Sequence, residues 1–414
     1  MMKFPKDFLW GAATSAYQVE GDNVNADWWP WEKKTGAYQS GKACRHYEFY
    51  KKDFDLAKKL HHNAHRFSIE WSRIEPKEGK FSKAALKHYI DVILALRKRH
   101  MEPLVTLHHF TNPIWFSEQG GWEKQQSVEK FLRYCDFLIR SLAKYVHYWI
   151  TINEPTIYIS HAYIFGVWPP QEKSYLKATA VAENLALAHV KAYSLVHKIY
   201  KESNILKPSV GIAQNVMAFV PYKQALKNRF TAFLRDRVYN LGFLERIMRQ
   251  HIIRQNTLDF IGINYYSRQL VELKKFGIGN LAMDVCDNNR HPCEKNSLGW
   301  EIYPQGLYDV LLELKRYDLP IMITENGVCT SDDRLRWKYI YDHLKNIYRA
   351  MRKGVQVTGY LYWSLMDNFE WDKGFAPRFG LIDIDYKTYK RTVRKSARLF
   401  GQVCKTGVLE KKKQ

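Results

Sequence analysis

Two segments of the 414-residue sequence end an apolar run with a glutamate beside an asparagine. The first contains Asn153, Glu154 and Pro155, and the second contains Glu325 and Asn326. A single acid of this kind is usually a helix cap or a loop-facing group, but two of them, on predicted strands three apart along the chain, favour a shared site. Two carboxylates across a sugar-sized gap are the minimal equipment for glycoside hydrolysis, with one protonated and one ionised. The pair therefore predicts this chemistry.

Neighbouring residues indicate how the protonation of the two acids could differ. Arg66 lies in the second predicted strand, and a guanidinium near Glu325 would keep that acid ionised at neutral pH. A purely structural ion pair is the alternative for Arg66. Glu154 precedes Pro155, and apolar, Trp-rich walls would raise its pKa. We predict Glu154 as the acid/base and Glu325 as the nucleophile, ~5 to 5.5 Å apart as in retaining enzymes.

Other predicted strand ends carry polar and aromatic groups suited to sugar hydroxyls and sugar faces. The adjacent pair His108-His109 resembles a metal site, but neighbouring residues on a strand point to opposite faces, so we expect one in the pocket and one in the packing. No metal site is predicted. The residues concerned are Gln18, Glu20, His108, His109, Asn264, Tyr265, Tyr266, Trp363, Glu370 and Trp371.

The pattern of elements explains why these groups would meet. Short apolar runs alternate with long amphipathic helical patterns, which implies parallel strands joined by right-handed crossovers. Eight such units predict an α/β fold, a single (β/α)8 TIM barrel over residues 1–414 with a frayed tail from about residue 406. An open doubly wound sheet is the alternative. No glycine-rich phosphate loop follows the first strand, however, and Gly277-Ile278-Gly279 is only a loop fragment.

The predicted boundaries are as follows. The strands are Leu9–Tyr17, Ala64–Ile69, Pro103–His108, Tyr148–Ile152, Ser209–Gln214, Phe260–Asn264, Ile321–Thr324 and Gly359–Leu365. The helices are Lys51–Leu60, Ala84–Arg99, Val128–Tyr145, Leu176–Ser203, Phe230–Arg249, Gly306–Tyr317, Asp333–Lys353 and about Thr392–Lys405.

Composition limits the other classes of function. The net charge of +22 could indicate a nucleic-acid or anionic partner, but Lys and Arg are spread over helical patterns, so solvated helix faces are favoured and no nucleic acid is expected. The six Cys show no zinc-like spacing; a bridge between Cys286 and Cys293 is the alternative to reduced thiols. No leader and no apolar run of membrane-spanning length is present, so we expect a cytoplasmic protein without a membrane partner.

Several motifs, in this order, resemble glycoside hydrolase family 1, and the resemblance extends from Phe8 to about Phe400. They are Phe8 to Gly21, Arg66 to Ile74, the Asn-Glu-Pro motif at Asn153, the Thr-Glu-Asn-Gly motif at Thr324, and Tyr362 to Trp371. The resemblance implies the same roles for Glu154 and Glu325, with Arg66, Asn264 and Tyr266 in the catalytic group. It further implies that Asn153 holds the sugar 2-hydroxyl and that Tyr266 donates to Glu325.

The resemblance also implies a substrate-binding set. Trp363 is expected as the floor of the glycone subsite and Trp300 as a platform on the aglycone side. The whole set is Gln18, His109, Asn153, Trp300, Trp363, Glu370, Trp371 and Phe379.

The sequence departs from the family pattern in three places. Phe110 follows the strand-three histidine where the family often has Trp, which removes a donor for the 3-hydroxyl and leaves the glycone open. The segments after Trp29 and from Lys274 to Asn296 are short, which implies an open aglycone entrance. Glu370 stands where the 6-phosphoglycosidase branch has Ser, and a carboxylate there would repel phosphate.

The sequence therefore predicts a retaining β-glycosidase that removes terminal non-reducing β-D-glucosyl residues through a glycosyl-enzyme, with galactosyl and fucosyl residues as further candidate substrates. Its expected partners are small β-glucosides or oligosaccharides, as a monomer or homo-oligomer. No cofactor is expected, since side chains fill both chemical roles. A transglycosidase, a non-catalytic sugar-binding barrel and a nucleic-acid binder are the alternatives.

Overall fold

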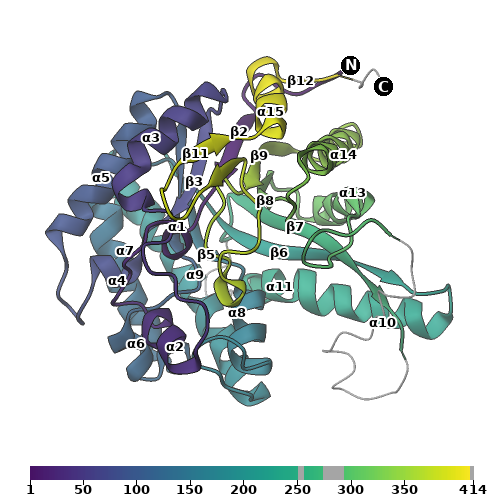
Figure 1. The fold of residues 1–414 in the computed structure, drawn as a ribbon. Coiled ribbons are helices and arrows are strands. Elements are labelled where there is room, and N and C mark those ends of the chain that lie inside the picture. Colours follow the sequence, from purple (N-terminus) through teal and green to yellow (C-terminus); the bar gives the residue numbers. More distant parts are fainter. Residues whose placement is uncertain (250–255, 274–292, 411–414) are drawn as a thin grey trace.

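A closed barrel of eight parallel strands is the centre of the computed structural model, which describes residues 1–249, 256–273 and 293–410 (Figure 1). Neighbouring strands pair in chain order, and the last pairs with the first. The (β/α)8 barrel and all eight predicted strands are confirmed. The strands are β2 (Leu9–Ala13), β3 (Ala64–Ser68), β4 (Glu102–His108), β5 (Tyr148–Asn153), β6 (Ser209–Pro221), β7 (Phe260–Val271), β8 (Ile321–Asn326) and β9 (Val357–Trp363).

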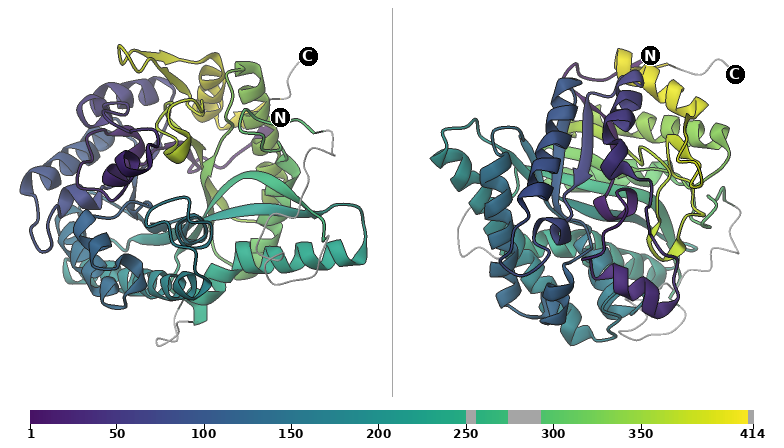
Figure 2. Two further views of the ribbon diagram at one scale, coloured as in Figure 1. Left: turned by 60° about the horizontal axis from the view of Figure 1, so that its bottom comes forward. Right: turned by 60° about the vertical axis from the view of Figure 1, so that its left-hand side comes forward.

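Helices cover the outside of the barrel (Figure 2). Their buried positions recur every three or four residues, as in α7, where Val128, Phe131, Cys135 and Leu138 face the barrel side. The long helices are α3 (His46–Lys59), α5 (Lys83–Lys98), α7 (Gln126–Leu142), α9 (Tyr175–Glu202), α10 (Leu226–Asp236), α11 (Gly242–Arg249), α13 (Pro304–Leu314), α14 (Asp333–Met351) and α15 (Lys395–Thr406). Shorter helices are α1 (Ala16–Val19), α2 (Trp28–Thr35), α4 (Trp71–Ile74), α6 (Ile114–Glu118) and α8 (Pro155–Ile159).

The hydrophobic core has two separate parts. The larger part lies between the strands and the helices. The smaller part fills the barrel interior, so the barrel is a packed core rather than a pore. Every strand contributes at least one buried residue to it, and the strand residues are Ala13, Ala64, Leu104, Ile150, Ala213, Phe260, Met322, Leu361 and Trp363.

The first strand is shorter than predicted. It ends at Ala13 rather than Tyr17, and Ala16–Val19 form α1. The backbone N–H of Thr14 still donates to the backbone carbonyl of Arg66, but the N–H of Ala16 donates to the side-chain hydroxyl of Ser68. The chain turns at this change from backbone to side-chain acceptor. This turn carries Gln18 into the barrel mouth.

The C-terminal segment also differs from the prediction. Residues Arg391–Val393 form β11, which pairs with β10 (Ile382–Ile384), so the last helix begins at Lys395 rather than at Thr392. Beyond that helix, β12 (Val408–Leu409) pairs with β1 (Met2–Lys3). The predicted frayed tail therefore contains a short strand, which lies beside the N-terminus in Figure 1.

Strands β6 and β7 continue past the barrel and pair as far as Pro221 and Val271, beside α10 (Figure 2). Both strands were predicted to end earlier, at Gln214 and Asn264. These residues mark the point at which the strands extend beyond the barrel. The helix predicted for Phe230–Arg249 consists of α10, a π-helical turn over Arg237–Leu241, and α11.

Gly327 marks a close approach of two backbones just after Glu325. A Cβ atom at this position would lie 1.8 Å from the carbonyl oxygen of Trp363, at the end of the neighbouring strand. Only glycine lets β8 leave the barrel at this point without displacing β9, which explains the last residue of the Thr-Glu-Asn-Gly motif.

We expect Gly327→Ala to lower the free energy of unfolding by about 1–3 kcal/mol, because the methyl group would overpack against backbone. Urea denaturation measures this change. Gly242→Ala is the matched control: its Cβ would lie 3.5 Å from the nearest atom, the carbonyl oxygen of Arg237, so stability should stay the same or rise slightly. Equal stability of the two variants would contradict the close approach.

Candidate active site

Glu154 and Glu325 lie at the carboxyl ends of β5 and β8, on one rim of the barrel, and both are buried. Glu154 follows the last residue of β5 with a left-handed backbone, φ 43°, and Pro155 begins α8 directly after it. Glu325 is itself part of β8 and is paired with Asn264 of β7. The side chain of the same Asn264 donates to Oε1 of Glu154 at 2.7 Å, so the two carboxyl groups share one site.

Glu325 is held by a cation and a phenol. Arg66 donates from one guanidinium nitrogen to Oε1 of Glu325 at 2.5 Å, and Tyr266 donates its hydroxyl to Oε2 at 2.5 Å. A second guanidinium nitrogen of Arg66 donates to Oδ1 of Asn153 at 2.6 Å. Burial raises the pKa of Glu325, and the Arg66 charge and both hydrogen bonds oppose that rise by stabilising the anion.

Glu154 is held by neutral groups. The side-chain amides of Asn215 and Asn264 donate to its Oε1 at 2.9 and 2.7 Å. Burial, followed by the charge of Glu325, raises the pKa of Glu154 to about 8. The two acids thus have unequal partners. Glu154 retains a proton at neutral pH, while Glu325 is in contact with a permanent cation.

Further predicted residues surround this pair. Gln18 donates to Oε2 of Glu370 at 3.3 Å and to the carbonyl of Phe369 at 2.8 Å. The ring of His109 lies 6.1 Å, centroid to centroid, from both Trp363 and Trp371 and nearly parallel to each, and its Nε2 contacts the amide of Asn153 at 3.2 Å. Its Nδ1 is buried with no hydrogen-bond partner among the residues described.

Glu370 is a third acid in the same site. Burial, then the charges of Glu325 and Glu154, raise its pKa to about 8. At neutral pH it is therefore mostly a neutral acid that can both donate to and accept from a hydroxyl. Such a group suits a sugar better than a fixed carboxylate alone, because each sugar hydroxyl is also both donor and acceptor.

An aromatic wall stands on the other side of Glu325. The rings of Tyr266, Trp300 and Phe379 contact one another with centroids 5.9 to 6.2 Å apart. Trp300 is 39% exposed, unlike the buried Phe379, so its face is available to a ligand. The structure thus brings together the residues that were predicted as catalytic or substrate-binding. Glu20 and Tyr265, which were also expected at strand ends, do not join them: Glu20 accepts from Arg73 at 2.8 Å, and the hydroxyl of Tyr265 donates to the carbonyl of Tyr303 at 2.6 Å.

His108 takes no part in this arrangement. Its Nε2 contacts Oδ1 of Asn112 at 3.0 Å, and its ring packs edge-on to Trp122 and Tyr158 outside the barrel interior. In the part of the chain that the structure describes, no group of three or more His, Cys, Asp or Glu is placed to hold a metal ion. No helix within those same residues is long and apolar enough to cross a membrane. Cys293 is a free thiol; Cys286 lies outside the described residues.

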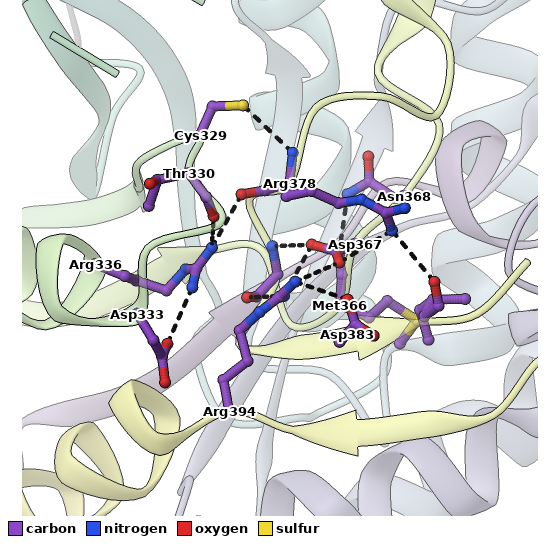
Figure 3. Close-up of polar contacts among 12 residues, drawn as sticks. Cys329, Thr330, Asp333, Arg336, Met366, Asp367, Asn368, Arg378, Asp383 and Arg394 are labelled. Carbon is purple, nitrogen blue, oxygen red and sulfur yellow. Dashed lines mark hydrogen bonds and ion pairs between the residues drawn. The ribbon is translucent and has the colours of Figure 1, made fainter. Parts of the chain in front are cut away.

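A buried ionic network holds the loop that carries Glu370 and Trp371 (Figure 3). Asp367 is fully buried and accepts from both terminal nitrogens of Arg394, at 3.0 and 2.9 Å, and from the backbone of Gly380 at 2.8 Å. Arg378 donates to the same carboxylate, and its own carbonyl accepts from Arg336 of α14. The loops after β8 and β9 are therefore fastened together next to Phe379.

Three residues of this site were not predicted: Asn215, Tyr239 and Asp367. Asn215 could have been recognised, because it directly follows the predicted strand Ser209–Gln214, where the other strands carry site residues. Tyr239 lies far from any strand end in the sequence, and only the break between α10 and α11 brings it near. Asp367 lies within a recognised motif, but its partners are distant in sequence.

A (β/α)8 barrel with two buried, unequally partnered glutamates at its rim defines the class of glycoside hydrolases. Comparison with known proteins identifies the family: the sequence model of glycosyl hydrolase family 1 matches residues 1–250 and 245–408, and the chain belongs to this family.

The relatives agree with this assignment. β-Glucosidase A of Thermotoga maritima is 31% identical, over 99% of this chain and 99% of its own length. The structure of a β-glycosidase from Pyrococcus horikoshii superposes with a TM-score of 0.89 at 38% identity, covering 99% of this chain and 96% of that one. The β-glucosidase of Thermotoga maritima in complex with deoxynojirimycin gives a TM-score of 0.91 at 29% identity, over 99% of this chain and all of its own.

We expect Asp367→Asn to lower the free energy of unfolding by about 3–5 kcal/mol, because it removes the buried carboxylate that pairs with the partly buried guanidinium groups of Arg378 and Arg394. The change is measured by urea denaturation at neutral pH. Asp383→Asn is the control: Asp383 also contacts Arg394, at 2.8 Å, but its side chain is 45% exposed, so the loss should stay within about 1 kcal/mol. Similar losses in both variants would contradict the special role of the buried acid.

Proposed function

We propose that this protein is a retaining β-glycosidase that removes terminal non-reducing β-D-glucosyl residues from small β-glucosides or oligosaccharides. The observation that carries the proposal is the unequal partnering of the two acids. Glu325 contacts the Arg66 guanidinium, and Oε1 of Glu154 accepts from two neutral amide groups. This is the charge distribution that a nucleophile and an acid need at the same pH.

In the proposed first step, a carboxylate oxygen of Glu325 attacks the anomeric carbon and forms a glycosyl ester. Glu154 gives its proton to the leaving oxygen at the same time. Tyr266 and Arg66 hold the nucleophile in place through both of its oxygens. No oxidant or metal is required by this step, since one bond is exchanged for another and one proton moves.

In the proposed second step, water replaces the leaving group and Glu154 acts as the base. The ester has removed the charge of Glu325, which is one of the causes of the raised pKa of Glu154, so Glu154 ionises more easily. Water gives a proton to Glu154 and attacks the anomeric carbon while the ester bond to Glu325 breaks. The sugar leaves with its original anomeric configuration, Glu325 is again a carboxylate, and Glu154 is again protonated.

The substrate assignment rests on the polar groups around the pair and on the relatives. Gln18, His109 and Glu370 present hydrogen-bonding atoms to the site, and Asn153 is held beside the nucleophile by Arg66. Relatives over the full chain are described as β-glucosidase and β-glycosidase. We propose glucosides as the first substrates to test, with galactosides and fucosides next, and Trp300 and Phe379 as the aglycone wall.

The overall experiment is hydrolysis of 4-nitrophenyl β-D-glucoside followed by NMR in the first minutes. The β-anomer of glucose should form first. An initial α-anomer would overturn the double displacement, and no hydrolysis of any β-glycoside in an aryl panel would overturn the enzyme assignment. A cytoplasmic site of action and the oligomeric state stay predictions.

For Glu325→Gln we expect turnover of every aryl β-glucoside to fall by more than about a thousandfold, because the amide cannot form the glycosyl ester. The fold should persist, as checked by circular dichroism and thermal unfolding. Glu313→Gln, on the outer helix α13, is the control and should keep its activity. Activity of Glu325→Gln near that of the wild type would contradict the nucleophile assignment.

For Glu154→Gln we expect damage that depends on the leaving group. Loss of proton donation should lower kcat/KM by about 10²- to 10⁴-fold for an unactivated alkyl glucoside, but far less for 2,4-dinitrophenyl β-D-glucoside, whose phenolate leaves unaided. Azide, a small anion that needs no base, should raise kcat on the activated substrate. An equal loss of kcat/KM for both substrates would contradict the assignment of Glu154 as the acid.

A further inference from the structure

The turn between α10 and α11 places a tyrosine against the acid/base site. The π-helical turn Arg237–Leu241 interrupts what would otherwise be one helix. Such turns are often found at functional sites. The turn is fixed to β6 by Asn240, whose side chain exchanges two hydrogen bonds with the backbone of Met217, at 2.8 and 2.9 Å, and by Gln214, which donates to the carbonyl of Tyr239 at 3.2 Å.

The hydroxyl of Tyr239 decides the orientation of Asn215. It donates to Oδ1 of Asn215 at 2.8 Å, so the carbonyl end of this amide faces Tyr239 and the N–H end faces Glu154. Asn264 has the same arrangement, since the hydroxyl of Thr324 donates to its Oδ1 at 2.6 Å. An amide that rotated by 180° would present an oxygen to the carboxylate instead, and the two oxygens would repel each other.

Both oriented amides donate to the same oxygen of Glu154. Asn215 and Asn264 contact Oε1, at 2.9 and 2.7 Å, and an oxygen that accepts two N–H bonds cannot also hold the acidic proton between them. The proton of the neutral acid therefore sits on Oε2. The same two bonds strengthen when Glu154 is ionised, because hydrogen bonds to charged groups are the stronger ones.

We propose that Tyr239 and Asn215 are a positioning pair for Glu154. The pair directs the proton of Glu154 to Oε2, and it stabilises the ionised form of Glu154 when this residue acts as the base. This inference rests on the function proposed above. The pair matters most in the second step: there the glycosyl ester is neutral, the base must be ionised, and the first step with a good leaving group does not need the acid.

The test uses Asn215→Leu and Tyr239→Phe with 2,4-dinitrophenyl β-D-glucoside, in steady-state and stopped-flow measurements from pH 4 to 9. The wild type should show a burst of dinitrophenolate, which means that the second step limits kcat. For Asn215→Leu we expect kcat at pH 6 to fall about tenfold and the acidic limb of kcat to rise by about one pH unit, since a donor to the ionised base is lost. Because the glycosyl-enzyme accumulates, KM should fall with kcat and kcat/KM should stay within about twofold.

Tyr239→Phe removes one hydroxyl and keeps Asn215. With the amide free to rotate, we expect the same signature in weaker form, about a threefold fall in kcat and a smaller rise of the acidic limb. Tyr200→Phe is the matched control. Tyr200 is more deeply buried than Tyr239, and its hydroxyl accepts from Trp149 at 2.8 Å on the outer side of the barrel, so its loss should change stability and leave kcat and the pH profile as they are.

The outcomes separate this inference from the function on which it rests. If the wild type shows no burst and releases glucose with inverted anomeric configuration, the proposed function would be overturned. If the wild type shows a burst, but both variants keep the kcat and the pH profile of the wild type, the positioning pair alone would be overturned. A fall of kcat/KM equal to that of kcat would indicate general disturbance of the site and would also overturn it.

Discussion

The contact between the Arg66 guanidinium and Glu325 is the interaction on which the chemistry of this barrel depends. Arginine stays charged at all relevant pH values, so it favours the ionised form of whichever carboxylate it touches. It touches Glu325 at 2.5 Å, whereas Glu154 receives the neutral amides of Asn215 and Asn264. Burial alone would raise the pKa of both acids. The cation makes them different, and in the proposed mechanism this difference allows one acid to donate a proton while the other attacks.

Barrel closure is what brings this cation to the acid it serves. Arg66 belongs to β3 and Glu325 to β8, strands that do not pair, so the contact crosses the barrel interior. Parallel strands all present their carboxyl ends to one rim, and small interior residues such as Ala64 and Ala213 leave room for the long side chain above them. The loops beyond the rim need separate support, and the buried Asp367 supplies it by fastening the segments after β8 and β9.

The sequence was sufficient for the barrel, because alternation of strand and helix leaves few topologies, and for the strand-end residues, because acids after apolar runs are otherwise hard to explain. It was insufficient where a contact depends on a local break in regular structure. Helical periodicity runs through residues 230–249, and nothing in that pattern indicates the π-helical turn that turns Tyr239 towards Asn215. The length of β6 was missed for a related reason: Asn215 resembles the end of a strand, but it pairs with Asn264 and the strand continues.

The three acids of the site, Glu154, Glu325 and Glu370, also influence one another's pKa values. Glu154 and Glu370 each have a pKa raised to about 8, and the charge of Glu325 is among the causes for both. Below that pH both are mostly protonated, so Glu325 and Arg66 supply the main opposing charges. In the proposed mechanism the glycosyl ester abolishes the charge of Glu325, and both of the other pKa values must fall together. The event that turns Glu154 into a base would then also make Glu370 a better acceptor for sugar hydroxyls. The hydrogen bonds between Glu370 and the sugar hydroxyls would therefore depend on whether the anomeric carbon is bonded to Glu325.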